Sequence, residues 1–305
     1  MAAITLIEYA KGIDNDFLRS VVETFASGSP VLGKLAFMDV KGGAIEYLQE
    51  DTLPGIAFRN VNATYTAGSG VINPLTEKVK ILGGTIETDI ALIRRFGDDR
   101  RKLDIEQKVK AAARYFDAMF IDGDESTYPA QFYGLNKRLT GNQLLYADGA
   151  GSAGAVLSEN IIDRLIDAVD EKPDLLLMGK AMYRQLKNLF KGSTIFGFTD
   201  PNYFGTRVPT FDGIEIGILD KDNLNNVILD IDETVGSDTC GSIYALKFGE
   251  NRLVGIQTAA PDAKDLGELS ATKLTYRFDW DVGIALFHPR CAARMAGIKK
   301  ASGVL

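Results

Sequence analysis

The sequence near the end of this chain reads Leu274-Thr275-Tyr276-Arg277-Phe278-Asp279-Trp280-Asp281-Val282-Gly283-Ile284-Ala285-Leu286, with an apolar side chain at every second position. Successive side chains of a β-strand point to opposite faces, so this period of two predicts one long strand with an apolar face. Because such a face must be covered, another element of the chain has to pack against it.

Residues 99–122 carry the longest helical pattern of the sequence and are the obvious partner. Apolar side chains fall on one broad face at helical spacing. At 1.5 Å per residue the helix would be about 35 Å long, so we interpret it as a structural spine. We expect Phe116 and Phe120 of this helix and Phe278 and Trp280 of the strand to lie in the structural core. The predicted apolar face consists of Leu103, Val109, Ala112, Ala113, Phe116, Met119 and Phe120, and the other faces carry Lys102, Glu106, Lys108, Lys110 and Asp117.

The composition places the chain among ordinary proteins that bury a core. It has 305 residues, 46% of them hydrophobic and 25% charged, which excludes disorder, collagen and coiled coil as global descriptions. No apolar stretch approaches the ~20 residues that cross a bilayer, and the first residues lack the pattern of a signal peptide. We therefore expect a soluble, non-secreted protein without a membrane partner.

Charge and cysteine content narrow the function classes further. The formal net charge is -7, which argues against holding nucleic acid as the primary task, because such proteins carry a basic stripe. Cys240 and Cys291 show no CxxC spacing, so neither a disulfide framework nor a zinc site is indicated. We expect both thiols to be reduced and buried.

No enzymatic constellation is recognisable. The single histidine, His288, has no identifiable nucleophile and excludes a multi-histidine zinc centre. Asp122-Gly123-Asp124-Glu125 resembles the start of a calcium loop, but the remaining ligand positions do not follow, so we interpret it as a helix stop. We predict no catalytic, cofactor-binding or metal-binding residues.

Gly149-Ala150-Gly151-Ser152-Ala153-Gly154 satisfies G-x-G-x-x-G and is the strongest contrary signal. A dinucleotide fold needs this loop to leave a buried strand and to open a helix directly. The preceding residues 142–148 are too short and polar for such a strand, and the next helix begins only after Ser158. We interpret the loop as a flexible linker, and keep a nucleotide-dependent enzyme as the less favoured alternative.

The first third of the chain changes pattern. A short amphipathic helix is predicted over 14–25, after an arm with few apolar residues. Two extended segments, 45–48 and 79–82, enclose a long Gly/Asn/Thr-rich stretch with turn signals. A two-stranded ribbon is marginal in water by itself. We therefore expect this ribbon to need another surface on which to lie.

The chain after the glycine loop has the pattern of a mixed α+β domain. Helices are predicted there over 159–169 and 181–190, and strands over 175–178, 214–218, 227–229, 243–246 and 253–256. A further short helix is predicted over 89–96, directly before the long helix.

Several short motifs then decide between the possible α+β folds by their order along the chain. They are Leu6-Ile7-Glu8-Tyr9-Ala10-Lys11 with Val21-Val22-Glu23-Thr24-Phe25, Ser29-Pro30-Val31-Leu32, Thr52-Leu53-Pro54-Gly55-Ile56-Ala57-Phe58-Arg59 with Gly70-Val71-Ile72-Asn73-Pro74, Phe132-Tyr133-Gly134-Leu135-Asn136-Lys137-Arg138-Leu139, and Pro173-Asp174-Leu175-Leu176-Leu177-Met178. In this order they resemble the major capsid proteins of tailed bacteriophages, in their unprocessed short-arm subgroup. That family has the Hong Kong 97 capsid fold, which encapsulin shells share.

The resemblance implies a division of the chain and a set of contact residues. Residues 1–38 would be an N-terminal arm, 39–87 an extended loop lying over a neighbouring subunit, 88–148 with 270–305 a peripheral domain, and 149–269 an axial domain. Inter-subunit contacts are expected at Leu53, Pro54, Ile56, Phe58 and Arg59 of the extended loop and at Leu6, Ile7 and Tyr9 of the arm.

The function that the resemblance implies is structural. The chain would assemble through pentamers and hexamers into an icosahedral phage head around double-stranded DNA, in the virion after assembly in the host cytoplasm. Its partners would be copies of itself, portal and decoration proteins, and DNA contacted non-specifically. The short arm leaves a separate scaffolding protein, or none. An encapsulin-type nanocompartment is the alternative. No lysine lies between Lys41 and Lys78, so we expect no isopeptide cross-link from the loop.

Overall fold

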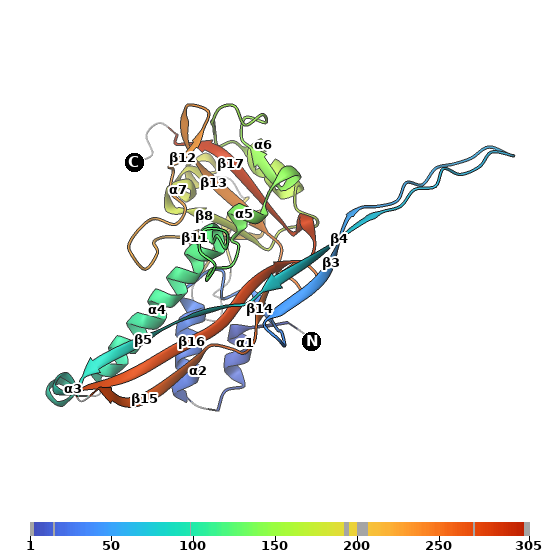
Figure 1. The fold of residues 1–305 in the computed structure, drawn as a ribbon. Coiled ribbons are helices and arrows are strands. Elements are labelled where there is room, and N and C mark those ends of the chain that lie inside the picture. Colours follow the sequence, from blue (N-terminus) through green and yellow to red (C-terminus); the bar gives the residue numbers. More distant parts are fainter. Residues whose placement is uncertain are drawn as a thin grey trace.

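The computed structural model describes residues 3–14, 16–97, 99–191, 195–199, 207–270 and 272–301. Figure 1 shows an upper body of helices and sheet, a lower body in which a long helix lies along a twisted sheet, and a hairpin that projects far from both. Within the described residues, no helix is long and apolar enough to cross a membrane.

The predicted alternating strand is confirmed as β16 (Lys273–Leu286), and it organises the lower, six-stranded sheet. β16 pairs antiparallel with β5 (Lys80–Asp89) along almost its whole length, from Lys80 opposite Val282 to Asp89 opposite Lys273. The other strands of this sheet are β1 (Ile4–Thr5), β2 (Ala36–Asp39), β14 (Leu253–Gln257) and β15 (Asp262–Ser270).

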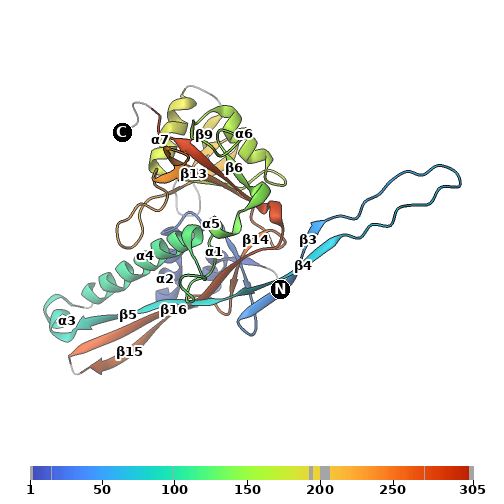
Figure 2. The same cartoon turned by 45° about the horizontal axis from the view of Figure 1, so that its top comes forward.

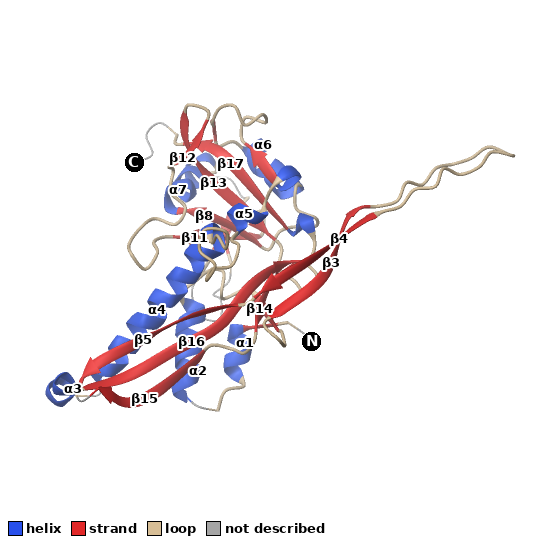
Figure 3. Cartoon of the chain, in the orientation of Figure 1, coloured by secondary structure: helices blue, strands red, loops and turns tan. Residues whose placement is uncertain are grey.

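The predicted spine helix is confirmed as α4 (Asp99–Asp122), and with α2 (Asp16–Ser27) it covers the apolar face of the sheet (Figure 3). The indole of Trp280, 1% exposed, lies at the centre of this core. Its ring centroid is 5.2 Å from that of Phe25, 5.0 Å from Phe37 and 5.5 Å from Phe116. Phe120 and Phe278 are buried in the same cluster.

Two predictions about the faces of α4 were wrong. Leu103, expected on the buried face, is 52% exposed, because the packed side of the helix begins only at Ile105. Asp117, expected away from the core, is 4% exposed, and its carboxylate accepts a hydrogen bond from the Ser29 hydroxyl. The chain after α2 folds over this part of the helix and buries a charged position.

The N-terminal segment is also different from the prediction of an arm that cannot bury itself. Helix α1 (Leu6–Lys11) packs beside α2, and β1 pairs with β2 of the same subunit. Leu6 is 1% exposed, so its predicted inter-subunit contact was wrong. Ile7 packs partly buried against the same core, whereas Tyr9 remains exposed. This segment has a core to join, because α2 and the sheet leave an apolar edge open to it.

The upper body contains a nine-stranded mixed sheet in the order β6-β17-β13-β8-β11-β10-β9, with β7 beside β17 and β12 beside β13. Parallel pairing of β8 with β11 across helix α7 accounts for the fully apolar strand β8. The bounds are β6 (Leu144–Tyr146), β7 (Ala155–Val156), α6 (Glu159–Asp167), β8 (Leu175–Gly179), α7 (Lys180–Leu189), β9 (Phe196–Phe198), β10 (Pro209–Phe211), β11 (Ile214–Leu219), β12 (Glu233–Val235), β13 (Asp238–Leu246) and β17 (Ala292–Lys299). Residues 227–229, predicted as a strand, make only one bridge, from Val227 to Lys221.

The chain crosses between the two bodies more often than predicted. β14 and β15 belong to the lower sheet although they fall within 149–269, the predicted axial range. Conversely, β6 and β17 belong to the upper sheet although they fall within 88–148 and 270–305. Strand length and polarity do not reveal these crossings, because each strand finds its sheet through partners distant in sequence.

The hairpin consists of β3 (Ala44–Thr52) and β4 (Val71–Lys78), which form a separate two-stranded sheet (Figures 1 and 2). The prediction that 79–82 forms its second strand was wrong, since the second strand is β4 and β5 begins at Lys80. After Val79 the chain exchanges one partner for another, because Leu82 and Ile86 have a core on which to pack and the residues of β4 do not. The remaining short helices are α3 (Ile90–Phe96) and α5 (Leu135–Arg138), with 3-10 turns at Gly141–Gln143 and Pro289–Cys291.

Candidate functional site

The end of the hairpin is the most unusual surface of the molecule. Every residue from 53 to 70, here called the loop tip, is exposed. Ile56 and Phe58 are almost completely accessible to solvent, and Leu53, Val61 and Tyr65 are largely so. All five residues predicted as loop contacts, Leu53, Pro54, Ile56, Phe58 and Arg59, lie in this tip. A contiguous group of exposed large apolar side chains marks an interaction surface.

The loop tip has a local structure of its own. The Arg59 guanidinium donates to the carbonyl of Ala63 over 3.2 Å and lies 5.2 Å from the ring centroid of Tyr65. The Ala63 amide donates to the Asn60 carbonyl over 3.1 Å, and Asn62 adopts a φ of 65°. Asn tolerates this left-handed conformation better than most residues. Arg59 therefore shapes the turn that presents Phe58.

The base of the hairpin, in contrast, is held firmly to the body. The Arg138 guanidinium of α5 forms a bidentate salt bridge with Glu77 of β4, donating to both carboxylate oxygens, and the Nη2–Oε2 distance is 2.7 Å. The same guanidinium donates to the Tyr133 carbonyl over 2.7 Å. Both side chains of the ion pair are mostly buried, and a two-pronged Arg–carboxylate pair fixes direction as well as distance.

The opposite strand of the hairpin is anchored to the end of β16. The Tyr47 hydroxyl donates to the Leu286 carbonyl over 3.0 Å, and the Gln49 amide donates to the same oxygen over 3.3 Å. The Tyr47 ring packs edge-on against the Phe287 ring, with 4.7 Å between the two ring centroids. Burial, with the nearby charge of Glu77, raises the pKa of Tyr47 to about 12. Sequence reasoning missed Arg138, Glu77 and Tyr47, because these contacts join segments that no local pattern connects.

Replacing Arg138 by methionine is expected to loosen the hairpin base. Glu77 would lose its partner in a mostly buried place, at a cost of roughly 1–3 kcal/mol. Amide hydrogen exchange should therefore become faster in β3 and β4 than in β16. Arg138→Lys keeps the charge but not the two-pronged geometry, so it should give an intermediate effect. Unchanged exchange in β3 and β4 of Arg138→Met would contradict the anchoring role.

The glycine loop does not have the geometry of a dinucleotide site. The Asp148 carboxylate accepts the backbone N–H groups of Gly151, Ser152 and Ala153 over 2.6, 2.9 and 2.9 Å. These hydrogen bonds hold the pKa of Asp148 well below its usual range. The amides that would cradle a phosphate are thus already occupied by the protein's own carboxylate. The loop is internally hydrogen-bonded, which contradicts the prediction of a flexible linker.

The other candidate groups have structural surroundings. The Asp124 carboxylate accepts hydrogen bonds from Ser126 and Thr127, which accounts for the acidic turn after α4. His288 Nδ1 accepts the Arg290 amide N–H over 3.2 Å and caps a 3-10 turn. Cys240 and Cys291 are both buried and unpaired with each other, and burial raises the pKa of Cys291 to about 12. In the part of the chain that the structure describes, no three His, Cys, Asp or Glu side chains are grouped to hold a metal ion.

Solved structures of an encapsulin and of a capsid are among those similar to this chain. The chain is similar to the SrpI encapsulin of Synechococcus elongatus, with a TM-score of 0.63 and 12% identity over 89% of this chain and 88% of that one. It is similar to the capsid of an empty GTA particle, with a TM-score of 0.61 and 13% identity over 89% and 90% of the two chains. A chain of Mycobacterium phage Adephagia matches over 99% of both lengths, with a TM-score of 0.58 and 14% identity.

At these identities the likeness is one of fold. The chain has the Hong Kong 97-type capsid fold, as the order of the sequence motifs predicted. No protein-family model and no curated protein matches the sequence.

Proposed function

We propose that this protein is a capsid subunit that assembles with copies of itself, through pentamers and hexamers, into an icosahedral phage head around double-stranded DNA. The observation that carries the proposal is the loop tip. Its large apolar side chains are held out in solvent by a firmly anchored base. A monomer would gain nothing from this arrangement, whereas a ring of copies would bury each tip on the next subunit.

The entropic cost of ordering the hairpin also supports assembly, because an isolated subunit has no contact that offsets it. A two-stranded ribbon is at best marginally stable by itself, and the 18-residue tip from 53 to 70 adds further ordering entropy. Burial of the tip on a neighbour offsets that entropy. In this proposal the ribbon of β3 and β4, rather than all of 39–87, forms the contact arm. The lower body then corresponds to the peripheral domain and the upper body to the axial domain.

The proposed shell encloses DNA and contacts other proteins of the phage head. A chain of net charge -7 surrounds DNA without a basic stripe to grip it, which suits non-specific contact with packaged DNA. The subunit acts structurally rather than as an enzyme, and it is located in the virion. Scaffolding, portal and decoration proteins are its proposed further partners.

An encapsulin-type nanocompartment is the second candidate, favoured by the likeness to the SrpI encapsulin. The two functions predict different contents for the same shell. Particles isolated from the native source would contain DNA in the first case and a cargo protein in the second.

Replacing residues 54–70 by a two-residue Asn-Gly turn tests the proposed assembly. The expected result is a folded subunit with an unchanged Tm and no shells in negative-stain electron micrographs, because the tip packs on another chain. The truncation of an exposed apolar residue elsewhere, Leu189→Ala on α7, serves as the matched control and should assemble normally. Normal shells from the shortened chain would refute the proposal, and so would monomers only from the unmodified protein.

A further inference from the structure

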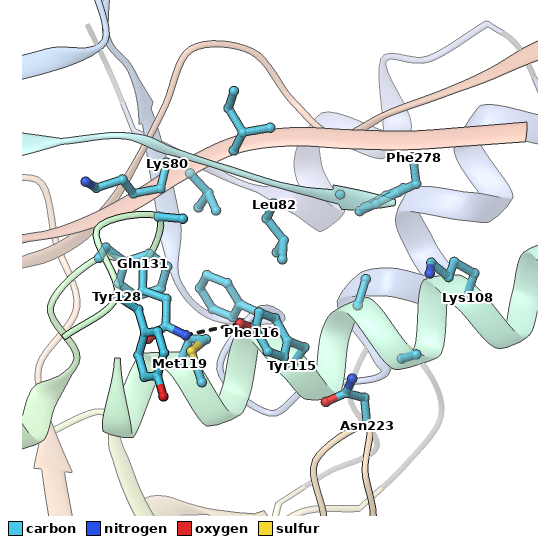
Figure 4. A pocket seen from close by; sticks show the side chains of 17 residues that line it. Lys80, Leu82, Lys108, Tyr115, Phe116, Met119, Tyr128, Gln131, Asn223 and Phe278 are labelled. Atoms are coloured by element: carbon cyan, nitrogen blue, oxygen red, sulfur yellow. Dashed lines mark hydrogen bonds between the residues drawn. The ribbon is translucent and has the colours of Figure 1, made fainter. Parts of the chain in front are cut away.

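The lower body contains an elongated cavity between α4 and β5, here called the slot (Figure 4). Its volume is about 460 Å³. Leu82 and Phe278 form its sheet side, and Phe116 and Met119 lie on its helix side. The lining of the slot on α4 runs from Lys108 to Met119, which is about 16 Å of helix at 1.5 Å per residue. The slot is therefore long rather than compact.

The size and the walls of the slot fit a hydrocarbon chain. A cavity of about 150 Å³ lined by apolar side chains holds one benzene ring, so about three times that volume has room for roughly a dozen or more carbon atoms. Ala112, Phe132 and Val282 add to the apolar lining. An apolar interior with a few polar groups is the usual composition of a ligand site. The elongated shape favours a flexible chain that follows the helix.

Lys108 closes one end of the slot. Its side chain reaches from α4 to β5, because a Cβ placed on Gly84 would lie 2.9 Å from Cε of Lys108 and 3.0 Å from its Nζ. Glycine at this position of β5 thus makes room for the lysine. Figure 4 shows the ammonium end directed toward the other side chains that line the slot. Lys108 is half-buried, so an anion bound to it would remain partly hydrated.

The charge of Lys108 has no hydrogen-bonding or ion-pair partner among the described residues. The acidic side chains around it are already paired. Asp104, one turn earlier on α4, lies 3.2 Å from the Arg100 guanidinium and accepts the Thr88 hydroxyl over 2.9 Å. Glu87 of β5 is paired with a lysine of β16 over 2.7 Å. An uncompensated cation at the end of an apolar slot is complementary to an anion that carries a hydrocarbon tail.

The cation at the opposite end of the slot is compensated. The Lys80 ammonium is 2.8 Å from a carboxylate oxygen of Glu125 and 2.7 Å from the Pro129 carbonyl. Gln131 donates to the Tyr115 hydroxyl over 3.3 Å, as the dashed line in Figure 4 shows. These polar groups satisfy one another, so this end suits the hydrocarbon end of a ligand. The distribution of charge therefore sets the direction in which a ligand lies.

We propose that the slot binds one long-chain carboxylate, with the carboxylate on Lys108 and the chain between Leu82, Phe116 and Met119. The site lies within a single subunit, so the inference goes beyond the proposed function and does not depend on it. Binding removes the apolar surface of the chain and of the walls from water, and it neutralises a half-buried cation.

Titration of full-length, unassembled subunits with a brominated dodecanoate tests the proposal. The chain contains one tryptophan, and the Trp280 ring centroid lies 5.5 Å from that of Phe116 in the wall of the slot. Dodecanoate with bromine on its terminal carbon should quench Trp280 fluorescence saturably, with one molecule bound per subunit. The equally brominated dodecanol has the same tail without the charge. It should bind about tenfold more weakly, because it forms no charge-assisted hydrogen bond with Lys108.

Two variants and a matched control locate the ligand. Lys108→Met should weaken dodecanoate binding about tenfold and leave dodecanol binding unchanged. Lys110→Met removes a charge from an exposed position of the same helix, where Lys110 lies 4.0 Å from Glu106, and should bind dodecanoate like the unmodified chain. Ala112→Leu narrows the slot and should weaken both ligands alike, with a Tm no lower than that of the unmodified chain.

Equal affinities for dodecanoate and dodecanol would overturn the proposal, because Lys108 would then only cover apolar surface with its aliphatic stem. Equal affinities of Lys108→Met and Lys110→Met for dodecanoate would also overturn it. Quenching that does not saturate would indicate detergent-like adsorption and would likewise refute a defined site. None of these results bears on assembly, which the shortened hairpin tests separately.

Discussion

Trp280→Ala is expected to destabilise the isolated subunit by about 3–5 kcal/mol, the range for removing a large buried aromatic side chain. The indole is 1% exposed and touches aromatic rings from three separate segments, at Phe25, Phe37 and Phe116. Removal of the indole leaves a cavity. The three rings cannot move inward to fill it, since α2, β2 and α4 are each fixed by other contacts.

A hydrogen bond adds to the cost. The indole N–H donates to the Gln257 amide oxygen over 3.1 Å, and Gln257 in turn donates to Asp39 over 2.9 Å. Trp280→Phe keeps a ring but leaves the buried Gln257 oxygen without this donor, so it should fall between the unmodified chain and the alanine variant. Urea denaturation of unassembled subunits measures all three. A loss below about 1 kcal/mol for Trp280→Ala would mean that the core relaxes around the site.

Asp117→Asn is expected to stabilise the subunit, and more so as the pH rises. Asp117 is buried where the loop after α2 packs on α4, and its carboxyl group accepts a hydrogen bond from the Ser29 hydroxyl. Ser29 Oγ itself accepts the amide N–H groups of Val31 and Leu32 over 3.1 and 3.0 Å. Burial raises the pKa of Asp117 from 3.8 to about 8, and the Ser29 hydrogen bond opposes part of that rise. Asparagine keeps an acceptor for Ser29 and has no charge to bury.

The direction of the pH dependence follows from proton binding. Between pH 3.8 and about 8 the folded chain holds a proton on Asp117 that the unfolded chain has released. The contribution of this group is therefore complete below pH 3.8 and is lost as the pH rises through about 8. The slope is at most about 1.4 kcal/mol per pH unit. The difference in unfolding free energy between Asp117→Asn and the unmodified subunit should widen with pH in this window.

Denaturation of Asp117→Asn and of the unmodified subunit at a series of pH values measures the difference in their unfolding free energies. The other carboxylates titrate alike in the two proteins, so their contributions cancel in this difference. Asp117→Ala removes the acceptor for Ser29 together with the charge and should be less stable than Asp117→Asn at every pH. Two curves that run parallel across the window would show that Asp117 titrates normally in the folded subunit.

Asp117 and Leu103 are residues of α4 whose burial helical spacing does not predict. Helical spacing places residues on a face correctly, and it located Phe116 and Phe120 in the core. It assigns a charged residue to solvent by default, since buried carboxylates are rare. Only the path of the chain around Ser29, which packs onto α4 from far away in sequence, determines that Asp117 is buried.

The extent of the ribbon has the same explanation. Turn signals and apolar residues indicated an extended excursion, and the exposed tip lies where they placed it. The strand after Val79 has a similar local character to β4, however, and differs in having β16 and a core beside it. The anchor of Arg138 on Glu77 is invisible for the same reason, because it joins residues 61 positions apart.

The long strand β16, the spine helix α4 and, through the order of the motifs, the capsid fold could all be predicted from the sequence. These are local periodicities and an order along the chain, which backbone geometry converts directly into elements. Three further features emerge only in the folded chain: which sheet each short strand joins, that Leu6 is buried while Phe58 is exposed, and that a cavity lies beneath β5. Those outcomes depend on which apolar surfaces remain uncovered once all elements have packed, a property of the whole chain that no window of it contains.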